Sequence, residues 1–395
     1  MKVYNFDEII ERRGTDSLKY DRLEAYFGKR DLMPFWVADM DFRTPDFILD
    51  AIKQRCEHPV FGYTHPSDAY ADSIIRWVND LHGWEIRREW ISFIPGVVKG
   101  IALAVEHFSG KGDKIVIQPP VYHPFRIVPD MLQREVVYNP LRMVNNRYEM
   151  DLEHLESILD KKCKILILSN PHNPAGIVWP EETLRELAKI CAKHGVLVIS
   201  DEIHSEMVYP PFTHHPFATV SDEAAACSIT FSAPSKTFNI AGIVASYAIV
   251  PDERLRKEFY TFLHAGEFHE GTIFSYIATI AAYTHGAEWR RQMLDYVMGN
   301  VRLADEFIKT YLPEIKVYPP QASFLIWLDC RDSGLSHREL VRTVRDDAGL
   351  ALNEGMMFGK EGEGFLRMNA GCPRAWLEKG LCAMKDALLR HTNIK

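Results

Sequence analysis

The sequence predicts an α/β fold with a mostly parallel sheet that is covered by helices on both faces. Residues 50–285 alternate short apolar runs with amphipathic stretches, which is typical of strand–helix–strand units. The apolar runs are uninterrupted, as expected of strands that are buried on both faces. Polar residues follow several runs directly, at the sheet edge where open α/β folds bind ligands. The 395 residues allow two or three domains.

The expected strands are short runs of apolar residues: 90–94, 114–118, 164–168, 196–200, 228–231 and 246–250. A helical pattern covers 180–194, where Pro180 is suited to the first turn and Gly195 to the end. A longer pattern covers 286–311, with apolar residues at helical spacing: Trp289, Met293, Val297, Val301, Ala304 and Ile308. We expect this long helix to join a large domain to a smaller one.

The predicted organisation has three parts. Residues 1–45 form an N-terminal segment that packs with the small domain, residues 46–288 form the large domain, and residues 289–395 form the small C-terminal domain. The small domain mixes helices with strands, and a strand pattern covers residues 323–327.

Composition excludes several classes of protein. Hydrophobic residues make up 47% and charged residues 25%, as in ordinary soluble globular proteins. The net charge of −8 predicts no nucleic-acid partner, because no basic surface is implied. The longest apolar stretch, about residues 240–250, is too short to span a bilayer, so no membrane partner is expected. The seven cysteines are scattered and odd in number, which predicts reduced thiols in a cytoplasmic protein.

Lys236 is the most informative residue. It follows the apolar run 228–231, in the segment Ser232-Ala233-Pro234-Ser235-Lys236. A lysine taken at random is usually a solvated surface charge. A partly buried amine has a lowered pKa, however, and the neutral amine forms Schiff bases with carbonyl groups. The neighbouring hydroxyls could bind an anion such as a phosphate.

Two other strand ends carry polar motifs. Ser169-Asn170-Pro171-His172-Asn173-Pro174-Ala175-Gly176 follows one run, and Ser200-Asp201-Glu202-Ile203-His204 ends the next. The distances along the chain from Asn173 to Asp201 and from Asp201 to Lys236 each leave room for a strand and a crossover helix. We therefore expect the three side chains at one edge of the sheet.

Together these motifs resemble the fold-type I pyridoxal-phosphate (PLP) enzymes, the aspartate aminotransferase superfamily. The resemblance covers essentially the whole chain. It implies PLP as cofactor, a large domain with a seven-stranded sheet, and a smaller α/β domain made from the C-terminal part and the N-terminal segment. It also implies a homodimer with shared active sites.

The resemblance implies a role for each matching residue. Lys236 would bind PLP, Asp201 would pair with the pyridinium nitrogen, and Asn173 would donate to the ring 3′-oxygen. Tyr122 would stack on the ring. The remaining residues of the cofactor site would be Gly96, Val97, Val98, Ser232 and Ser235 at the phosphate, with His204 nearby. Tyr63 would reach the phosphate of the neighbouring subunit and also border the substrate. Arg367 would bind the substrate carboxylate, since a planar guanidinium suits that anion.

The reaction is predicted from a narrower resemblance. Many transaminases of this superfamily carry an arginine where this chain has Val244. The segment Trp36-Val37-Ala38-Asp39-Met40-Asp41-Phe42 instead resembles bacterial cystathionine β-lyases and cystalysin-like C–S lyases, and Ala38 would border the substrate. We therefore expect α,β-elimination on L-cystathionine, L-cysteine or cysteine S-conjugates, giving a thiol, pyruvate and ammonia. Lys236 would be the base, and Tyr122 is a second candidate for the catalytic proton donor.

Two alternatives remain. One is a PLP-dependent class I/II aminotransferase on the same scaffold, which would need a 2-oxo acid. The other is a regulatory protein that uses the fold as a platform for a protein partner. No metal site is expected, because the pair His269-Glu270 lacks the second histidine of a zinc protease motif.

Overall fold

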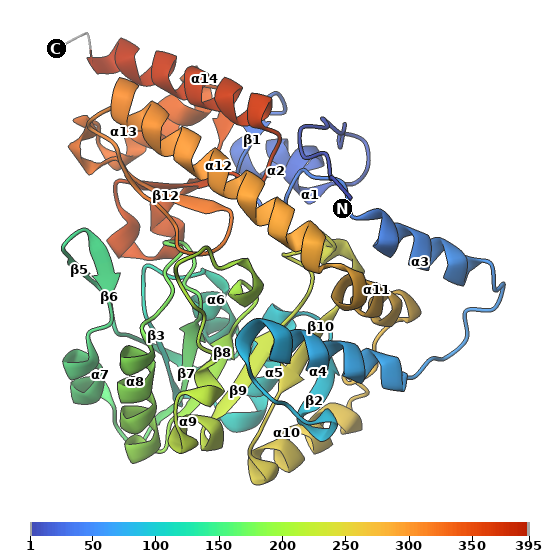
Figure 1. Cartoon of the computed structure of the whole chain (residues 1–395). Helices are drawn as coiled ribbons and strands as arrows, with labels where there is room; N and C mark the ends of the chain where they lie inside the picture. Colours follow the sequence, from blue (N-terminus) through green and yellow to red (C-terminus); the bar gives the residue numbers. More distant parts are fainter. Residues whose placement is uncertain (1, 393–395) are drawn as a thin grey trace.

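The computed structural model describes residues 2–392, and its centre is a seven-stranded sheet (Figure 1). The strand order is β2-β10-β9-β8-β7-β3-β4; β10 runs antiparallel to β2 and β9, and the other neighbouring pairs are parallel. The strands are β2 (Ile91–Ile94), β3 (Lys114–Ile117), β4 (Glu135–Tyr138), β7 (Cys163–Ser169), β8 (Leu197–Asp201), β9 (Ser228–Ser232) and β10 (Ser246–Ile249). The predicted mostly parallel sheet is confirmed.

Both faces of the sheet are buried. In β7, Ile165 and Ile167 pack into the core that includes α5 (Val97–Phe108) and α10 (Glu253–Ala265). Leu166 and Leu168 point to the opposite core, which includes α8 (Glu181–His194). Successive strand side chains face opposite sides, so a strand covered twice shows an unbroken apolar run. The other helices around this sheet are α3 (Asp46–Cys56), α4 (Asp68–His82), α6 (Pro124–Met131), α7 (Leu152–Ile158), α9 (Asp222–Ala226) and α11 (Ile273–His285).

The ends of α8 follow the local sequence. Pro180 occupies the N-cap position, and Gly195 ends the helix with a left-handed φ of 67°. Glu181 and Glu182 lie in the first turn and Lys193 and His194 in the last, as the helix dipole favours. The prediction of this helix is confirmed.

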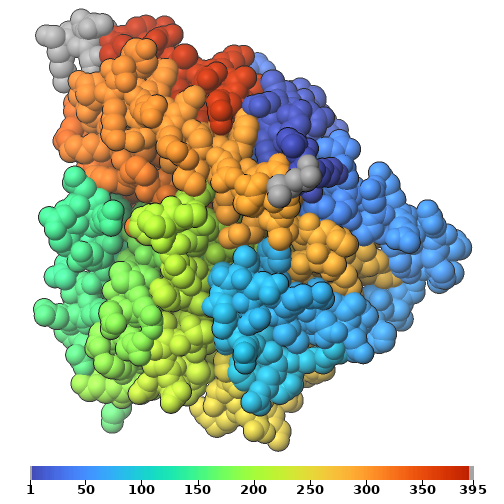
Figure 2. Space-filling model, in the orientation of Figure 1, coloured from blue at the N-terminus to red at the C-terminus, as the bar shows by residue number. Residues whose placement is uncertain are grey.

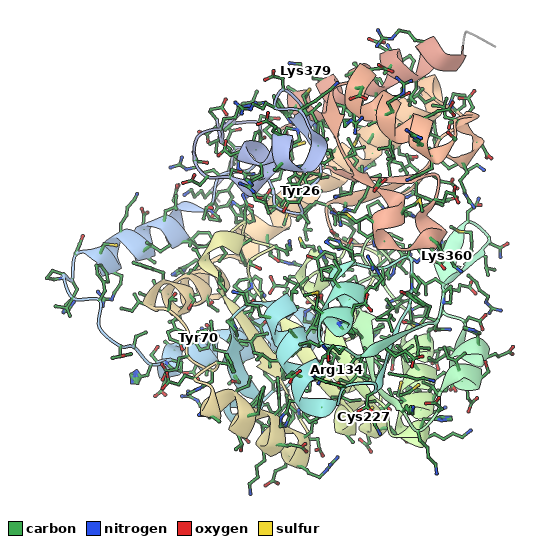
Figure 3. The ribbon with its side chains drawn as sticks, turned by 180° about the vertical axis from the view of Figure 1, so that it is seen from behind. Tyr26, Tyr70, Arg134, Cys227, Lys360 and Lys379 are labelled. Atoms are coloured by element: carbon green, nitrogen blue, oxygen red, sulfur yellow. The ribbon has the colours of Figure 1, made fainter. Side chains whose placement is uncertain are left out.

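A second, four-stranded antiparallel sheet lies in the C-terminal part of the chain. Its order is β11-β12-β15-β14, with strands β11 (Lys316–Tyr318), β12 (Leu325–Asp329), β14 (Asn353–Glu354) and β15 (Phe365–Asn369). The helices α13 (His337–Arg342) and α14 (Arg374–Thr392) belong to this part. Seen from behind, Figure 3 shows Lys379 in this part, and Tyr70 and Arg134 in the part with the seven-stranded sheet.

Helix α12 (Ala287–Tyr311) connects the two parts as one continuous diagonal helix (Figure 1). All six apolar residues that predicted it are buried. The N-terminal segment, with α1 (Leu18–Asp21), α2 (Leu23–Phe27) and β1 (Met33–Pro34), lies beside the C-terminal part. There β1 pairs in parallel with β13 (Leu350–Ala351).

Several elements differ from the sequence-based expectation. Strand β4 was not predicted, because it lies at the sheet edge and its residues are exposed or half-buried. The strand expected from residue 323 begins at Leu325, since Ser323 has a left-handed φ of 75°. Trp90 belongs to the short turn η1 (Arg88–Trp90) before β2. Residues 142–149 form a small hairpin of β5 (Arg142–Val144) and β6 (Arg147–Glu149).

Helix α3 and the loop that follows it protrude from one edge of the molecule (Figure 2). This loop carries Tyr63, whose side chain is fully exposed. Within residues 2–392, none of the helices combines the length and the apolar character that a membrane span requires.

Candidate active site

A cavity of about 270 Å³ opens at the carboxyl ends of β7, β8 and β9. It collects all but three of the predicted site residues. Those that line it are Ala38, Gly96, Val97, Val98, Tyr122, Asn173, Asp201, His204, Ser235 and Lys236. The motifs from successive strand ends therefore meet at one edge of the sheet, as expected of an open α/β fold.

Lys236 is buried at this cavity. Its Nζ donates a hydrogen bond to the carbonyl oxygen of Ala38 at 2.5 Å. Burial lowers the pKa of the Lys236 amine to about 8, although the carboxylates of Asp39 and Asp201 oppose that shift. The neutral amine, which nucleophilic attack on a carbonyl requires, is therefore far more abundant near neutral pH than in an ordinary solvated lysine.

Asp201 ends β8 and faces the same cavity. Its Oδ1 accepts a hydrogen bond from the Ile203 amide at 3.1 Å. Burial raises the pKa of the Asp201 carboxyl to about 7. Among residues 2–392 the carboxylate makes no ion pair within 4.0 Å, so a protonated ring nitrogen placed in the cavity would satisfy it.

His204 adds a second buried polar group that lacks a partner. Burial lowers the pKa of its imidazole to about 3, so the ring is neutral. Its Nδ1 makes no hydrogen bond within the described part of the chain. Buried polar groups normally have partners, so this atom and the Asp201 carboxylate indicate a cavity built for a polar ligand. The two groups fit an aromatic cofactor such as PLP.

Asn173 links the cofactor residues to Arg367. Its Oδ1 accepts from Arg367 Nη1 at 3.0 Å, which leaves its Nδ2 as the donor toward the cavity. Its backbone carbonyl accepts from the Tyr122 amide at 3.1 Å. The Oγ of Ser169 accepts from the Asn173 amide at 3.0 Å. These bonds fix the position of the Asn173 side chain and of the loop that carries Tyr122.

Arg367, on β15, is a buried cation without a carboxylate partner among residues 2–392. Its Nη2 donates to the Trp36 carbonyl at 3.0 Å and to Asn353 Oδ1 at 2.6 Å. Its Nε has no partner among these residues. Burial lowers the pKa of the guanidinium to about 10, so it stays charged at neutral pH. A buried, unpaired guanidinium beside Asn173 fits the carboxylate of an amino acid.

The segment of residues 36–42 is fixed over Lys236 from several sides. Asn369 Nδ2 donates to the carbonyls of Val37 and Asp39, each at 2.7 Å. The buried Lys19 pairs with the buried Asp41 at 2.7 Å. These contacts hold the Ala38 carbonyl in place against the Lys236 amine.

Three predicted site residues lie outside the group that lines the cavity. Arg367 contacts it through Asn173, as described above. Ser232 borders a separate small cavity together with Glu206 and Tyr247. Tyr63 lies on the protruding loop, over a surface hollow formed with residues 270–274. The roles given to all the site residues remain predictions.

Three polar residues at the cavity were missed by the sequence reasoning, Lys99, Ser169 and Ser246, besides four apolar ones. Ser169 directly follows an apolar run, the position that singled out Asp201, so its signal was present. Lys99 is the first cation of the helix after Gly96. Ser246 opens β10, and only the pairing of β10 with β2 brings it to the cavity edge.

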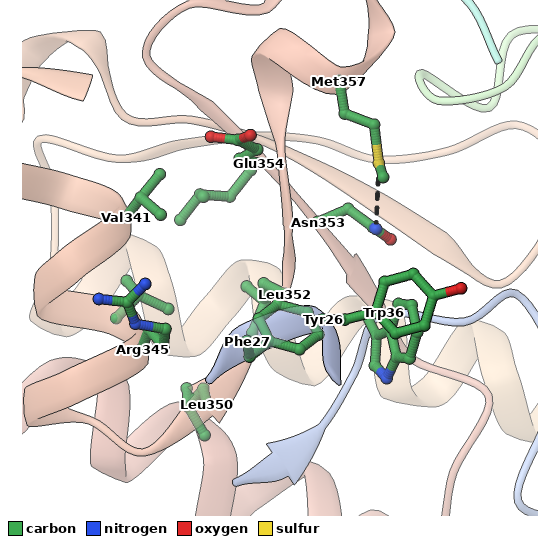
Figure 4. A pocket seen from close by; sticks show the side chains of 12 residues that line it. Tyr26, Phe27, Trp36, Val341, Arg345, Leu350, Leu352, Asn353, Glu354 and Met357 are labelled. Atoms are coloured by element: carbon green, nitrogen blue, oxygen red, sulfur yellow. Dashed lines mark hydrogen bonds between the residues drawn. The ribbon is translucent and has the colours of Figure 1, made fainter. Parts of the chain in front are cut away.

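A second cavity of about 270 Å³ lies between the N-terminal segment and the C-terminal part (Figure 4). Its wall is mainly apolar and aromatic, with Tyr26, Phe27 and Trp36 among the lining residues. Asn353 contacts Met357 there, with 3.3 Å between Nδ2 and Sδ. The guanidinium group of Arg345, which also lines this cavity, is paired with Asp346. We assign the active site to the first cavity, because the lysine and the unpaired carboxylate lie there.

Within residues 2–392 no cluster of three or more His, Cys, Asp or Glu side chains is arranged to hold a metal ion.

Comparison with known proteins identifies similar chains. The family model for aminotransferase class I and II matches residues 30–383. Cystathionine beta-lyase PatB of Bacillus subtilis (strain 168) is 43% identical over 97% of this chain and 100% of its own. Cystalysin from Treponema denticola, solved with a pyridoxal 5′-phosphate cofactor, is 31% identical with a TM-score of 0.95, covering 99% of this chain and 100% of its own. The PLP-bound C-S lyase from Staphylococcus hominis is 33% identical with a TM-score of 0.91, covering 98% and 99%.

Proposed function

Because this chain belongs to the aminotransferase class I and II family, we propose that it is a PLP-dependent C–S β-lyase. Its substrates are L-cystathionine, L-cysteine or cysteine S-conjugates, and its products are a thiol, pyruvate and ammonia. The observation that carries the proposal is the buried Lys236 amine facing the unpaired Asp201 carboxylate in one cavity. The similarity over the full length to a cystathionine beta-lyase and to a C-S lyase supports elimination as the reaction.

The chain's residues would hold the cofactor as follows. Asp201 would accept a hydrogen bond from the protonated ring nitrogen, Asn173 would donate from Nδ2 to the ring oxygen, and Tyr122 would pack against the ring. The first amides of α5, at Val97 and Val98, and the Ser235 hydroxyl would donate to the phosphate. When bound, PLP supplies an electron sink that stabilises negative charge at the substrate Cα.

Arg367 and Lys236 then act on the amino acid. Arg367 binds the α-carboxylate through its guanidinium, which orients the Cα–H bond toward Lys236. The neutral Lys236 amine takes the Cα proton. The electron pair left at Cα forms a Cα=Cβ double bond as the Cβ–S bond breaks, and the pair of that bond goes to the sulfur. The protonated Lys236 returns a proton to the thiolate, so the amine is neutral again. Water completes the conversion of the remaining three-carbon unit into pyruvate and ammonia.

We also propose that the enzyme is a homodimer in the cytoplasm. The exposed Tyr63 lies outside the cavity of its own chain, which fits a residue that serves the partner's site. Val60 and Phe61 beside it are exposed apolar residues, as expected of an interface. All seven cysteines are free, which suits a reducing compartment.

The experiment mixes the purified protein and PLP with L-cystathionine, without any 2-oxo acid, and follows pyruvate and free thiol. Equal amounts of both products support elimination. Lys236→Ala should lower the rate by about 10²- to 10⁴-fold, the range for loss of a general base. Lys111→Ala, an exposed lysine ahead of β3, is the matched control and should keep the full rate. Turnover only after a 2-oxo acid is added would make the protein an aminotransferase, the function that the family's description favours as second candidate.

A further inference from the structure

We propose that Lys99 is the side chain that neutralises the phosphate of the bound cofactor. The inference rests on the proposed function, because it presumes that PLP occupies the cavity. It assigns a binding role to a residue that the sequence motifs did not single out.

The charge of the cavity wall is the first argument. A phosphate monoester carries a charge of about −1.5 to −2 at neutral pH. At the α5 end of the cavity, the lining residues Gly96, Val97, Val98, Ser235 and Val244 are all uncharged. They offer amides and a hydroxyl, but no full positive charge.

Only two of the described residues that line the cavity carry a cationic side chain, Lys236 and Lys99. His204 also lines the cavity, but its burial keeps the imidazole neutral. Lys236 is engaged in bonding the cofactor and in proton transfer. Lys99 is therefore the cation left for the phosphate.

The direction of the Lys99 side chain is the second argument. Lys99 is the third residue of α5, and helical side chains lean toward the N-terminus of their helix. Its Cδ lies 4.0 Å from the position that a Cβ would take on Gly96, and Val244 Cγ1 lies 3.9 Å from the same point. The Lys99 side chain thus folds back over the first turn of α5, where the free amides are.

The amine of Lys99 is also uncommitted. None of the hydrogen bonds or ion pairs found for residues 2–392 involves its Nζ, whereas Lys114 and Lys193 pair with carboxylates. The cavity beside it is built for a polar ligand, because the Nδ1 of the buried His204 also lacks a partner there. An uncommitted cation, free helix amides and the Ser235 hydroxyl together match a phosphate.

The test compares the cofactor affinity of apo-protein variants, read from the absorbance of bound cofactor at equilibrium. Lys99→Gln should raise the Kd for PLP about tenfold or more, the effect of losing a hydrogen bond to a charged group. Lys99→Arg should stay within a few-fold of the wild type. The matched control is Lys111→Gln, which should leave the Kd unchanged.

Binding of pyridoxal, which lacks the phosphate, shows whether Lys99 acts through the phosphate group. Lys99→Gln should leave the Kd for pyridoxal unchanged, which also shows that the variant is folded. The difference between wild type and Lys99→Gln for PLP should shrink as salt screens the charge. Equal PLP affinity of the two proteins, or an equal loss for PLP and pyridoxal, would overturn the role of Lys99. A wild-type protein that binds no PLP would instead overturn the proposed function.

Discussion

At the scale of single residues, burial sets the chemistry of the candidate site. The same desolvation that lowers the pKa of Lys236 raises that of Asp201, because burial disfavours the charged form of each group. The lowered pKa suits Lys236 to act as a base near neutral pH. A protonated ring nitrogen beside Asp201 would favour the carboxylate form and lower the pKa of Asp201 again. Arg367 keeps its charge under the same burial, since its pKa starts far higher.

The variant Asp201→Asn tests how strongly the buried Asp201 carboxylate lowers the free energy of unfolding. The folded-state pKa of about 7 lies above the ordinary value of 3.8, so the carboxylate destabilises the apo-protein increasingly between pH 3.8 and 7 and by a constant amount above that. The shift of about three units corresponds to about 4 kcal/mol at most. Asp201→Asn apo-protein should therefore gain stability over wild type as pH rises from 5 to 8, measured by urea unfolding. It should also bind PLP more weakly. A stability difference that does not change with pH would contradict the role of burial.

At the scale of elements, the loop after β7 depends on close docking. Gly176 has a left-handed φ of 65°, and its carbonyl accepts from the amides of Gln321 and Ala322 at 2.8 and 3.1 Å. A Cβ on Gly176 would lie 2.5 Å from Pro320 Cβ and 2.9 Å from the Ala322 carbonyl oxygen. The loop that carries Asn173 is thereby held against the segment leading into β12.

Gly176→Ala should destabilise the protein and weaken PLP binding. Gly195→Ala is the matched control, since Gly195 has a similar φ of 67° but no atom within 4 Å of the added Cβ. The control should lose about 1–2 kcal/mol, the cost of a left-handed alanine, and keep its PLP affinity. Gly176→Ala should lose more, because the clash adds to that cost, and urea unfolding with PLP titration measures both effects. Equal losses in the two variants would show that the loop tolerates the added methyl group.

At the scale of the whole molecule, the candidate site draws on distant parts of the chain. Ala38 comes from the N-terminal segment, Lys236 from the loop after β9, and Arg367 from the four-stranded sheet. We propose the domain division 1–45, 46–288 and 289–395 on this arrangement, with α12 as the connection. The protruding loop with Tyr63 suggests that a further part of the site comes from a second copy.

Mixing two inactive variants tests the shared site. Lys236→Ala and Tyr63→Ala each damage every site of their own homodimer, if Tyr63 serves its partner. A mixed dimer has one site with both residues intact, so random reassortment should restore about one quarter of the wild-type activity. The assay follows pyruvate after unfolding and refolding the mixture. If the mixture never exceeds the mean of the two variants, Tyr63 does not act across the interface.

The sequence by itself determined the class of the fold and the family. Strands and helices follow from apolar periodicity, so β7, β8, α8 and α12 were predictable. Lys236, Asp201 and Asn173 stood out because parallel strands place their carboxyl ends at one edge. This local logic explains why the predicted residues that follow β2, β3, β7, β8 and β9 meet in one cavity.

Only the tertiary structure decided which neighbours meet there. The bond between Arg367 and Asn173 joins residues 194 positions apart, and no local pattern encodes it. Ser232 and Ser235 belong to the same short motif, yet they border different cavities, because the chain turns after β9. The local sequence does not distinguish Lys99 from an ordinary surface lysine. Only the direction of its side chain, which folds back over Gly96, gives it a candidate ligand. Side-chain direction and long-range packing depend on the whole fold, so they became visible only in three dimensions.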